Sequence, residues 1–372
     1  MTPNMNSNLK VALVHDWLTG MRGGEKCLEV FCDLFPQADI FTLLHIRGSV
    51  SEKIESHSIH TSFLQKIPFI KNHYRHTLPL MPKAIESFQL QGYDLVISTS
   101  HCVAKGCKVP KGITHICYCF TPMRYVWDQF DNYFNNGRSG WLSSHLMKIL
   151  RTPLQRWDVE SSKNVTHFVS ISNFIKNRIQ NYYQRESEVI YPPVDTSFYT
   201  PSPNPANDYF LIVSALVPYK RVDLAVEAFN LSGQPLKIVG SGPMENNLKK
   251  LAKSNIEFLG WKEDGELKAL YQNCKALIFT SEEDFGIVPL EAMACGKPVI
   301  AFKKGGALET VLDQVTGLYF QEPTPLSLLD SIQRYKNISW DPQKIRQHAL
   351  TFGKDRFIKE IKNYIDGNFL IL

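Results

Sequence analysis

The strongest constraint on the fold of this 372-residue chain is a strand–turn–helix rhythm that occurs twice along the sequence. Short apolar runs bounded by turn residues predict strands, and longer amphipathic patterns between them predict helices. In the first half the predicted strands cover residues 11–15, 40–44, 94–98, 115–119 and 167–171. In the second half they cover residues 209–213, 236–239, 256–259, 276–279, 298–302 and 318–320. This alternation is typical of α/β proteins with parallel sheets covered by helices on both faces.

A segment rich in proline and polar residues, 191–205, separates the two halves and is the clearest linker in the chain. We therefore expect two facing, doubly wound domains, residues 1–195 and residues 196–350. Residues 351–372 should follow as a C-terminal helix, which we expect to pack back onto the first domain. Ligands of such sheets bind at the carboxyl ends of the strands, so we expect a cleft between the two domains.

Composition excludes several other classes of protein. The chain is 44% hydrophobic and 21% charged, which is typical of a globular protein rather than a disordered one or a coiled coil. No apolar run has the length of a membrane span, and residues 1–8 lack the features of a signal peptide. The eight cysteines show no paired CxxC spacing, which favours a reduced, cytoplasmic protein without a zinc site.

The net charge of +5 lies entirely in the first half, because residues 1–195 hold 21 Lys/Arg and 16 Asp/Glu while the remainder holds 20 of each. Cations and apolar residues alternate over residues 62–83, which indicates peripheral binding to an anionic membrane surface. An ordinary solvated surface and an amphipathic helix facing the core are the alternatives. No nucleic-acid partner is predicted. The interleaved residues are Lys66, Ile67, Phe69, Ile70, Lys71, Tyr74, Arg75, Leu78 and Lys83.

The most informative motif places two carboxylates, Glu283 and Glu291, eight residues apart. Between them, Phe-Gly and a proline predict a helix from about Val288 to Cys295, with Glu291 in its first turn. The free amides at the start of that helix would bind an anion. A phosphate site between two hydroxyl-binding carboxylates matches a sugar nucleotide. Local capping of the helix, or acid–base chemistry by a glycosidase-like carboxylate pair, are the alternatives.

Other turns could contact the same ligand. Lys220 and Arg221 are adjacent cations at a predicted helix start, where the helix dipole disfavours them unless an anion binds there. Gly23 and Gly24 open a helix without the complete dinucleotide-binding spacing, so hydride transfer is disfavoured. Trp261 follows a predicted strand, where backbone groups could pair with a nucleobase.

Together these residues resemble the retaining glycosyltransferases of family 4, which have the GT-B fold. Glu283 and Glu291 match that family's E-x7-E motif, Gly23-Gly24 its N-terminal glycine loop, and the turn containing Gly242 its C-domain turn. The resemblance covers nearly the whole chain. The stretches 15–26, 118–128 and 217–223 are similar to one branch, the O-antigen and polysaccharide mannosyltransferases.

The resemblance implies a role for each matching residue. The catalytic group would be Glu283, which holds hydroxyls of the donor sugar, with Lys220 and Arg221, which neutralise the leaving diphosphate. The donor-binding residues would be Gly23, Gly24, Gly242, Trp261, Phe285, Gly286, Ile287 and Glu291, the last holding the ribose. The candidates on the acceptor side are Asp16, Arg124, Tyr125 and His101. The expected donor is GDP-mannose, no metal or other cofactor is required, and the acceptor would be a glycan or a polyprenyl-linked glycan.

Two positions depart from the family pattern. Ala215 occupies the position of the usual arginine, whose charge Arg221 could supply. Phe120 occupies the position of a histidine that normally contacts the donor sugar, for which His101 is a candidate substitute. A GT-B-type sugar-nucleotide epimerase, or a nucleotide-sugar-binding protein without turnover, therefore remain alternatives to a hexosyltransferase.

Overall fold

The computed structural model of the chain describes residues 9–128, 130–131, 141–203 and 208–369. Its contacts divide the chain into two compact units, residues 1–190 with 358–372, and residues 191–357. The first division falls after residue 190, five residues before the boundary expected from the linker. The N-terminal residues 1–8 and the end of the proline-rich segment, 204–205, lie outside the described residues.

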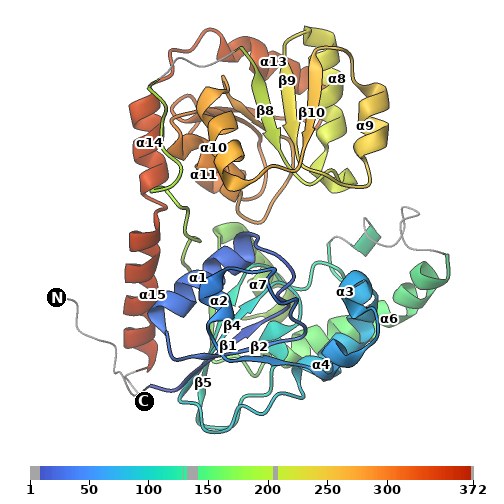
Figure 1. The fold of residues 1–372 in the computed structure, drawn as a ribbon, viewed down its shortest axis with the longest axis vertical. Coiled ribbons are helices and arrows are strands. Elements are labelled where there is room, and N and C mark those ends of the chain that lie inside the picture. Colours follow the sequence, from blue (N-terminus) through green and yellow to red (C-terminus); the bar gives the residue numbers. More distant parts are fainter. Residues whose placement is uncertain (1–8, 129, 132–140, 204–207, 370–372) are drawn as a thin grey trace. The chain divides into compact units, whose positions relative to one another are not determined.

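The first unit is built on a seven-stranded parallel sheet with the order β3-β2-β1-β4-β5-β6-β7 (Figure 1). Leu13 in the interior strand β1 pairs with Ile40 on one side and with Ile97 on the other. Successive strands are added in one direction up to β3 and in the other direction from β4 onward, so the topological switch point lies between β1 and β4. The strands are β1 Val11–His15, β2 Asp39–Thr42, β3 Ile59–Thr61, β4 Leu95–Ser100, β5 Thr114–Cys119, β6 His167–Ser170 and β7 Ser187–Val189.

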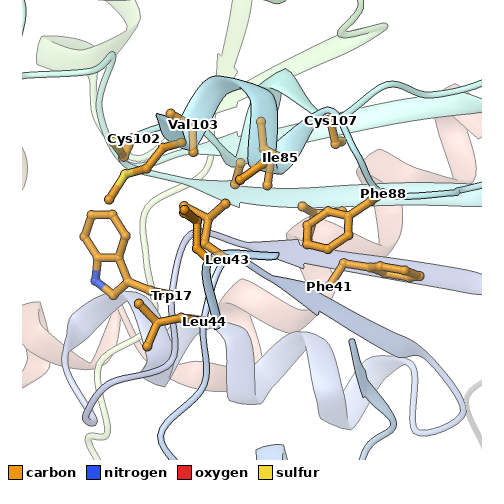
Figure 2. Close-up of a cluster of buried hydrophobic side chains, with 14 of the residues drawn as sticks. Trp17, Phe41, Leu43, Leu44, Ile85, Phe88, Cys102, Val103 and Cys107 are labelled. Atoms are coloured by element: carbon orange, nitrogen blue, oxygen red, sulfur yellow. The ribbon is translucent and has the colours of Figure 1, made fainter. Parts of the chain in front are cut away.

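Helices cover both faces of this first sheet. On one face, side chains of α3, α4 and α6 belong to a buried cluster that also includes Trp17, Phe41 and Val103, and Figure 2 shows part of it. On the other face, Phe31 of α1 packs edge-on against Tyr118 of β5, with ring centroids 5.7 Å apart. The α-helices are α1 Gly23–Leu34, α2 Glu52–Glu55, α3 Ile70–His73, α4 Met81–Ile85, α6 Trp141–Ser162 and α7 Asn173–Tyr183. The described residues of this unit also form the 3-10 helices η1 Phe63–Lys66, η2 Tyr74–Leu80 and η3 Ala104–Gly106.

The second unit has a six-stranded parallel sheet with the order β10-β9-β8-β11-β12-β13. Its switch point lies between β8 and β11, the same position as in the first sheet. The strands are β8 Phe210–Val213, β9 Leu236–Val239, β10 Ile256–Gly260, β11 Leu277–Phe279, β12 Val299–Phe302 and β13 Gly317–Phe320. The prediction of two doubly wound parallel sheets is therefore confirmed.

The core of the second unit lies between its sheet and the helices α8, α9 and α13, where Phe210, Phe229 and Ile332 are almost completely buried. Helix α11 packs against the sheet with Leu290 and Met293 fully buried. The helices are η4 Pro218–Lys220, α8 Val222–Ser232, α9 Glu245–Leu251, α10 Asp264–Asn273, α11 Ile287–Ala294, α12 Ala307–Thr310, α13 Pro325–Tyr335 and α14 Pro342–Leu350.

The proline-rich segment is not a loose spacer over the part that the structure describes. Arg346 of α14 donates to the carbonyls of Thr196 and Tyr199, at 3.2 and 2.9 Å, and Arg356 donates to the carbonyl of Tyr191 at 2.8 Å. Residues 191–203 thus belong to the second unit. The final helix, α15 Lys354–Phe369, begins in that unit, and its residues from 358 onward group with the first.

Two further predictions concern side chains and membranes. All eight cysteines are buried as free thiols, including Cys117 and Cys119 in β5. Within the described ranges, no helix combines the length and the apolar character needed to cross a lipid bilayer.

Candidate functional site

The switch point of the second unit holds an ion pair between Lys220 and Glu283. Lys220 ends η4 in the loop after β8, and Glu283 lies in the loop after β11. Thr280 donates to the carbonyl of Lys220 at 2.7 Å, and Ser281 donates to Glu283 Oε1 at 2.9 Å. Two hydroxyl groups therefore position the partners of this pair at the edge where α/β sheets bind their ligands.

Arg221 follows as the N-cap residue of α8, with a left-handed backbone (φ 52°) that residues other than glycine rarely adopt. Its guanidinium lies 3.4 Å from the carboxylate of Asp223 in the first turn of the helix, and its side chain is 41% exposed. The acidic partner offsets the unfavourable placement of a cation at a helix start.

Helix α11 begins one residue earlier than expected, at Ile287, because Gly286 takes the left-handed conformation (φ 91°) as its N-cap. Glu291 is consequently the fifth residue of the helix and lies in its second turn, so the prediction of a first-turn position was wrong. The proline is the third helical residue rather than the second. The loop before the helix is tightly packed, because a Cβ on Gly306 would lie 2.3 Å from the backbone of Phe285.

The carboxylate of Glu291 is held from inside the unit. Tyr271 of α10, which is fully buried, donates its hydroxyl to Glu291 Oε2 at 2.9 Å. Glu291 itself is only 7% exposed. Sequence reasoning missed Tyr271, whose one signal is its position among the apolar residues of an amphipathic helix.

Two glycine turns complete this edge of the second sheet. Gly240 (φ 128°) donates its amide to the carbonyl of Gly260 at 2.8 Å, and a Cβ there would lie 1.9 Å from the carbonyl oxygen of Ser214. A Cβ on Gly242 would lie 2.4 Å from the carbonyl oxygen of Leu216. Glycine is therefore required for the loops after β8 and β9 to touch. Trp261, after β10, is 71% exposed.

In the first unit, Asp16 follows β1 and His101 follows β4, so they flank the other switch point. The Asp16 carboxylate is completely buried and accepts four backbone amides, those of residues 101–104, at 2.6–3.0 Å. Its Oδ2 also lies 3.0 Å from His101 Nδ1. Burial acts to raise the pKa of Asp16, but the charge and hydrogen bonds of His101 outweigh burial and hold that pKa well below its usual range.

The glycine loop opens α1, which begins at Gly23. A Cβ on Gly24 would lie 3.5 Å from the Phe120 ring and 3.6 Å from His15, so these three residues are neighbours. His15 is buried, with Nδ1 2.7 Å from the hydroxyl of Thr99 and Nε2 3.8 Å from Glu25. Phe120 thus lies beside the glycine loop, as does His15.

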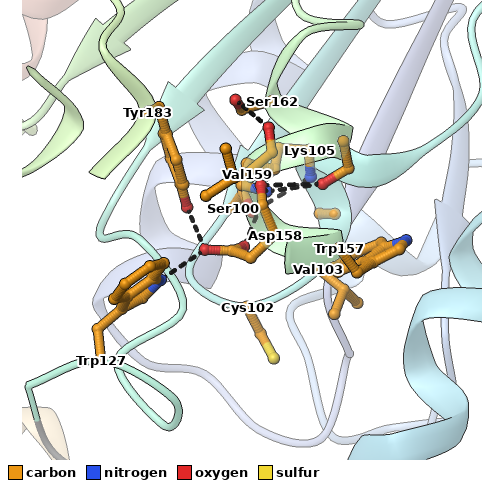
Figure 3. Close-up of polar contacts among 12 residues, drawn as sticks. Ser100, Cys102, Val103, Lys105, Trp127, Trp157, Asp158, Val159, Ser162 and Tyr183 are labelled. Carbon is orange, nitrogen blue, oxygen red and sulfur yellow. Dashed lines mark hydrogen bonds and ion pairs between the residues drawn. The ribbon is translucent and has the colours of Figure 1, made fainter. Parts of the chain in front are cut away.

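The loop containing Arg124 and Tyr125, both half-buried, is anchored by a buried polar network (Figure 3). Trp127, in the same loop, donates to Asp158 Oδ2 at 2.8 Å. Asp158 pairs with Lys105 Nζ at 2.8 Å, and the two side chains are 0% and 1% exposed. Nothing in the sequence pattern indicated that Lys105 would be buried or that Asp158 would be its partner.

The two edges offer different chemistry. In the second unit, a lysine, an arginine and the amides of a helix start can stabilise a departing diphosphate, and two carboxylates can accept hydroxyl protons in hydrogen bonds. The first unit offers small residues that let a ligand approach the backbone, and a histidine fixed by a buried carboxylate.

Comparison with known proteins supports the same class of protein. Residues 38–198 match the family described as Glycosyltransferase Family 4, and residues 199–351 match Glycosyl transferases group 1. The chain therefore belongs to the family 4 glycosyltransferases of the GT-B fold, close to the mannosyltransferases.

Three curated relatives match part of the chain. An uncharacterized glycosyltransferase of Methanocaldococcus jannaschii is 32% identical over 199 residues, 52% of this chain and 56% of that protein. The O-antigen chain mannosyltransferase C of Escherichia coli is 29% identical over 35% of this chain and 38% of its own. A GDP-mannose-dependent alpha-(1-6)-phosphatidylinositol monomannoside mannosyltransferase of Mycolicibacterium smegmatis is 29% identical over 48% of this chain and 53% of its own. The matches thus span about half of these relatives or less.

The fold is shared with the crystal structure of Anabaena HepE in complex with UDP and glucose. The TM-score is 0.68 with 18% sequence identity, over 96% of this chain and 99% of that one.

Proposed function

We propose that the protein transfers a hexose, with mannose as the best-supported sugar, from a nucleotide sugar to a hydroxyl of a glycan or polyprenyl-linked glycan, with retention of configuration. The observation that carries the proposal is the pairing of Lys220 with Glu283 at the switch point of the second sheet. The names of the E. coli and mycobacterial relatives support mannose, and the latter supports GDP-mannose as the donor.

The lysine–glutamate pair provides a movable charge. When the donor binds, the ammonium of Lys220 would turn from Glu283 to the diphosphate, and Glu283 would accept a hydrogen bond from a hydroxyl of the donor sugar. Arg221 and the amides at the start of α11 would add to the stabilisation of the leaving group. Because the charge on the diphosphate grows as the glycosidic bond breaks, these contacts strengthen in the transition state and lower the barrier. The departing phosphate would take the proton of the acceptor hydroxyl.

At the other end of the donor, Glu291 would hold the ribose hydroxyls, with Tyr271 fixing one carboxylate oxygen. We propose that no metal is required, since the cationic side chains supply the charge. EDTA should then leave the rate of transfer unchanged, whereas a rate restored only by Mg²⁺ or Mn²⁺ would contradict this part of the proposal.

The test is a transfer assay with GDP-mannose, UDP-glucose and ADP-glucose, with and without a polyprenyl-linked acceptor. Acceptor-dependent release of nucleotide, fastest with GDP-mannose, is the expected result. A changed sugar without nucleotide release would identify an epimerase, and binding without turnover would identify a nucleotide-sugar-binding protein.

A matched pair of variants separates the site from general charge effects. Lys220→Met should lower kcat/KM by about a hundredfold or more, the usual consequence of losing one electrostatic group at a leaving group. Lys249→Met, on α9, also removes a lysine that pairs with a glutamate, at 2.7 Å, and should leave the rate unchanged. Equal rates for both variants would contradict the assignment of Lys220.

We also propose that residues 62–83 attach the protein to an anionic membrane, where a lipid-linked acceptor would be found. Phe69 is 83% exposed, and the side chains of Lys66, Lys71 and Arg75 are exposed beside it. Other residues of the segment, including Tyr74, are buried in the core, so the short helices are anchored while their outer side chains face solvent. A large apolar side chain among cations is suited to the headgroup region of anionic lipids.

Reversal of the three charges, with Lys66, Lys71 and Arg75 each changed to Glu, should abolish sedimentation with liposomes containing phosphatidylglycerol. The control reverses three exposed lysines of α9 and the turn after it, at positions 249, 250 and 253. Binding that survives the first set, or is lost equally with both, would contradict the membrane proposal.

A further inference from the structure

The carboxylate of Asp16 has no capacity left for a substrate. It accepts the amides of residues 101–104, two on each oxygen, and lies 3.0 Å from His101 Nδ1. A carboxylate offers about four lone-pair sites, and this one is 0% exposed. Asp16 therefore cannot contact a substrate directly, and the side chain that it positions, His101, is the candidate for that contact.

That residue is His101, and Asp16 fixes its tautomer. Since a carboxylate only accepts hydrogen bonds, Nδ1 must carry the hydrogen, and in the neutral imidazole Nε2 then presents a lone pair. The ring is further held by Trp17, which packs edge-on with centroids 4.5 Å apart. The described part of the chain provides no hydrogen-bond partner for Nε2, and the side chain is 22% exposed.

The position of this imidazole is that of a ligand contact. It follows β4 next to the end of β1, at the switch point of the first sheet, where ligands of open α/β sheets bind. The centroid of the His15 ring lies 6.2 Å from that of His101. A Cβ added to Gly24 would lie 3.6 Å from the His15 ring. An imidazole nitrogen at this edge, with a glycine loop on the far side of His15, is suited to a hydroxyl group that approaches closely.

We propose that His101 Nε2 accepts a hydrogen bond from a sugar hydroxyl of a substrate and that Asp16 is its positioning residue. This inference rests on the proposed glycosyl transfer. The hydroxyl belongs either to the donor sugar or to the acceptor glycan, and the kinetic constants for the two substrates distinguish these sources.

Two substitutions separate the two nitrogens of the ring. His101→Asn places an amide near the position of Nδ1, so it keeps the bond to Asp16 but removes the group at Nε2. His101→Gln reaches the position of Nε2 with an amide oxygen but holds Asp16 less well. His57→Asn is the control, because His57 also uses Nδ1 to bind an oxygen, that of Ala38 at 2.8 Å.

We expect His101→Asn to keep a melting temperature close to that of the wild-type protein while kcat/KM for one substrate falls about tenfold, the size of one lost hydrogen bond to a hydroxyl. His101→Gln should recover part of that loss despite a lower melting temperature. A raised KM for the donor, with slower hydrolysis of the donor alone, identifies a donor hydroxyl. A raised KM for the acceptor, with unchanged donor hydrolysis, identifies an acceptor hydroxyl.

A purely structural role predicts the reverse order, with His101→Asn fully active and His101→Gln impaired only through its stability, and that result would overturn the inference. If the wild-type protein shows no transfer, the proposed function and the inference fail together. If the wild-type protein transfers and His101→Asn matches it, only the inference fails. The tautomer has its own readout, because ¹⁵N NMR of histidine-labelled protein should place the hydrogen of His101 on Nδ1, and a hydrogen on Nε2 would contradict the argument.

Discussion

Replacing Lys105 by Met should be among the most destabilising single changes in the first unit. Its ammonium lies 2.8 Å from the Asp158 carboxylate, and the exposed fraction of either side chain is at most 1%. With an effective dielectric constant of 20, the attraction at this distance is about 6 kcal/mol, most of which offsets the desolvation of the two charges. Removing one partner leaves a buried, uncompensated charge and costs about 3 to 5 kcal/mol.

The side chain of Met is suited to this substitution because it keeps the length and the apolar stem. The Lys105 ammonium lies over the rings of Trp157 and Tyr183, with 5.3 and 4.8 Å to the centroids, so a methionine would remain in contact with both. The loss therefore reports on the ammonium, with its charge and its hydrogen bonds to the Asp158 carbonyl and the Ser161 hydroxyl, rather than on a cavity. For a unit of this size it corresponds to a fall of about 6 to 20 °C in melting temperature.

The assay is equilibrium unfolding in guanidinium chloride, followed by tryptophan fluorescence, since Trp127 and Trp157 both lie at this network. Adding Asp158→Asn to Lys105→Met removes the orphaned charge while keeping an amide oxygen for Trp127. The stability lost by the double variant should then be smaller than the sum of the losses of the two single variants by about 1.5 to 3 kcal/mol. Additive losses, or a loss below 1 kcal/mol for Lys105→Met, would refute the reasoning. Lys163→Met is the control. It breaks an exposed ion pair with Glu160 at the end of α6, the helix that carries Asp158, and should change the stability little.

Three further outcomes follow from the structure. Gly306→Ala should cost about 1 to 3 kcal/mol and weaken nucleotide binding, because its Cβ would lie 2.3 Å from the backbone of Phe285, and a variant that binds GDP normally would contradict this packing. Tyr271→Phe should weaken GDP binding about tenfold in calorimetry, because the substitution removes the hydrogen bond that positions the Glu291 carboxylate for the ribose hydroxyls. Binding of 2′,3′-dideoxy-GDP, which lacks those hydroxyls, should be unaffected. The pKa of Asp16 is lowered by folding, so its stabilisation is complete above about pH 4 and is lost as the pH falls further. Acid unfolding of an Asp16→Asn variant should accordingly be less steep, and an unchanged slope would exclude Asp16 as a contributor.

The sequence was sufficient to predict the strands of both sheets that carry the switch points, because parallel strands buried on two faces are nearly continuous apolar runs. The edge strands of the first sheet escaped prediction because they lack such runs, whereas those of the second sheet, β10 and β13, were predicted. β3 and β7 each have three residues, include polar side chains and are only partly buried. Pattern alone does not separate such strands from loops.

Within the candidate site, the residues found from the sequence are those in turns, where glycine, proline and charge have local causes. Lys220, Glu283 and Gly242 are of this kind. The partners that position the site are distant in sequence, as with Tyr271 and Glu291, and nothing local links them. Asp16 shows the opposite error, because a carboxylate in a motif was expected to face the acceptor whereas the tertiary fold turns it inward onto four amides.

The two switch points use a carboxylate in opposite ways, and the difference fits the chemistry proposed for each. Lys220 has a flexible stem, and its ammonium is a compact charge that can exchange Glu283 for a phosphate at little cost in geometry. His101 is fixed by a saturated carboxylate and an aromatic edge, so it cannot exchange partners and presents one nitrogen in one direction. A leaving group that gains charge during the reaction requires a cation that can follow it. A hydroxyl that must be held in one orientation requires an acceptor that does not move, and a buried Asp16 provides that rigidity.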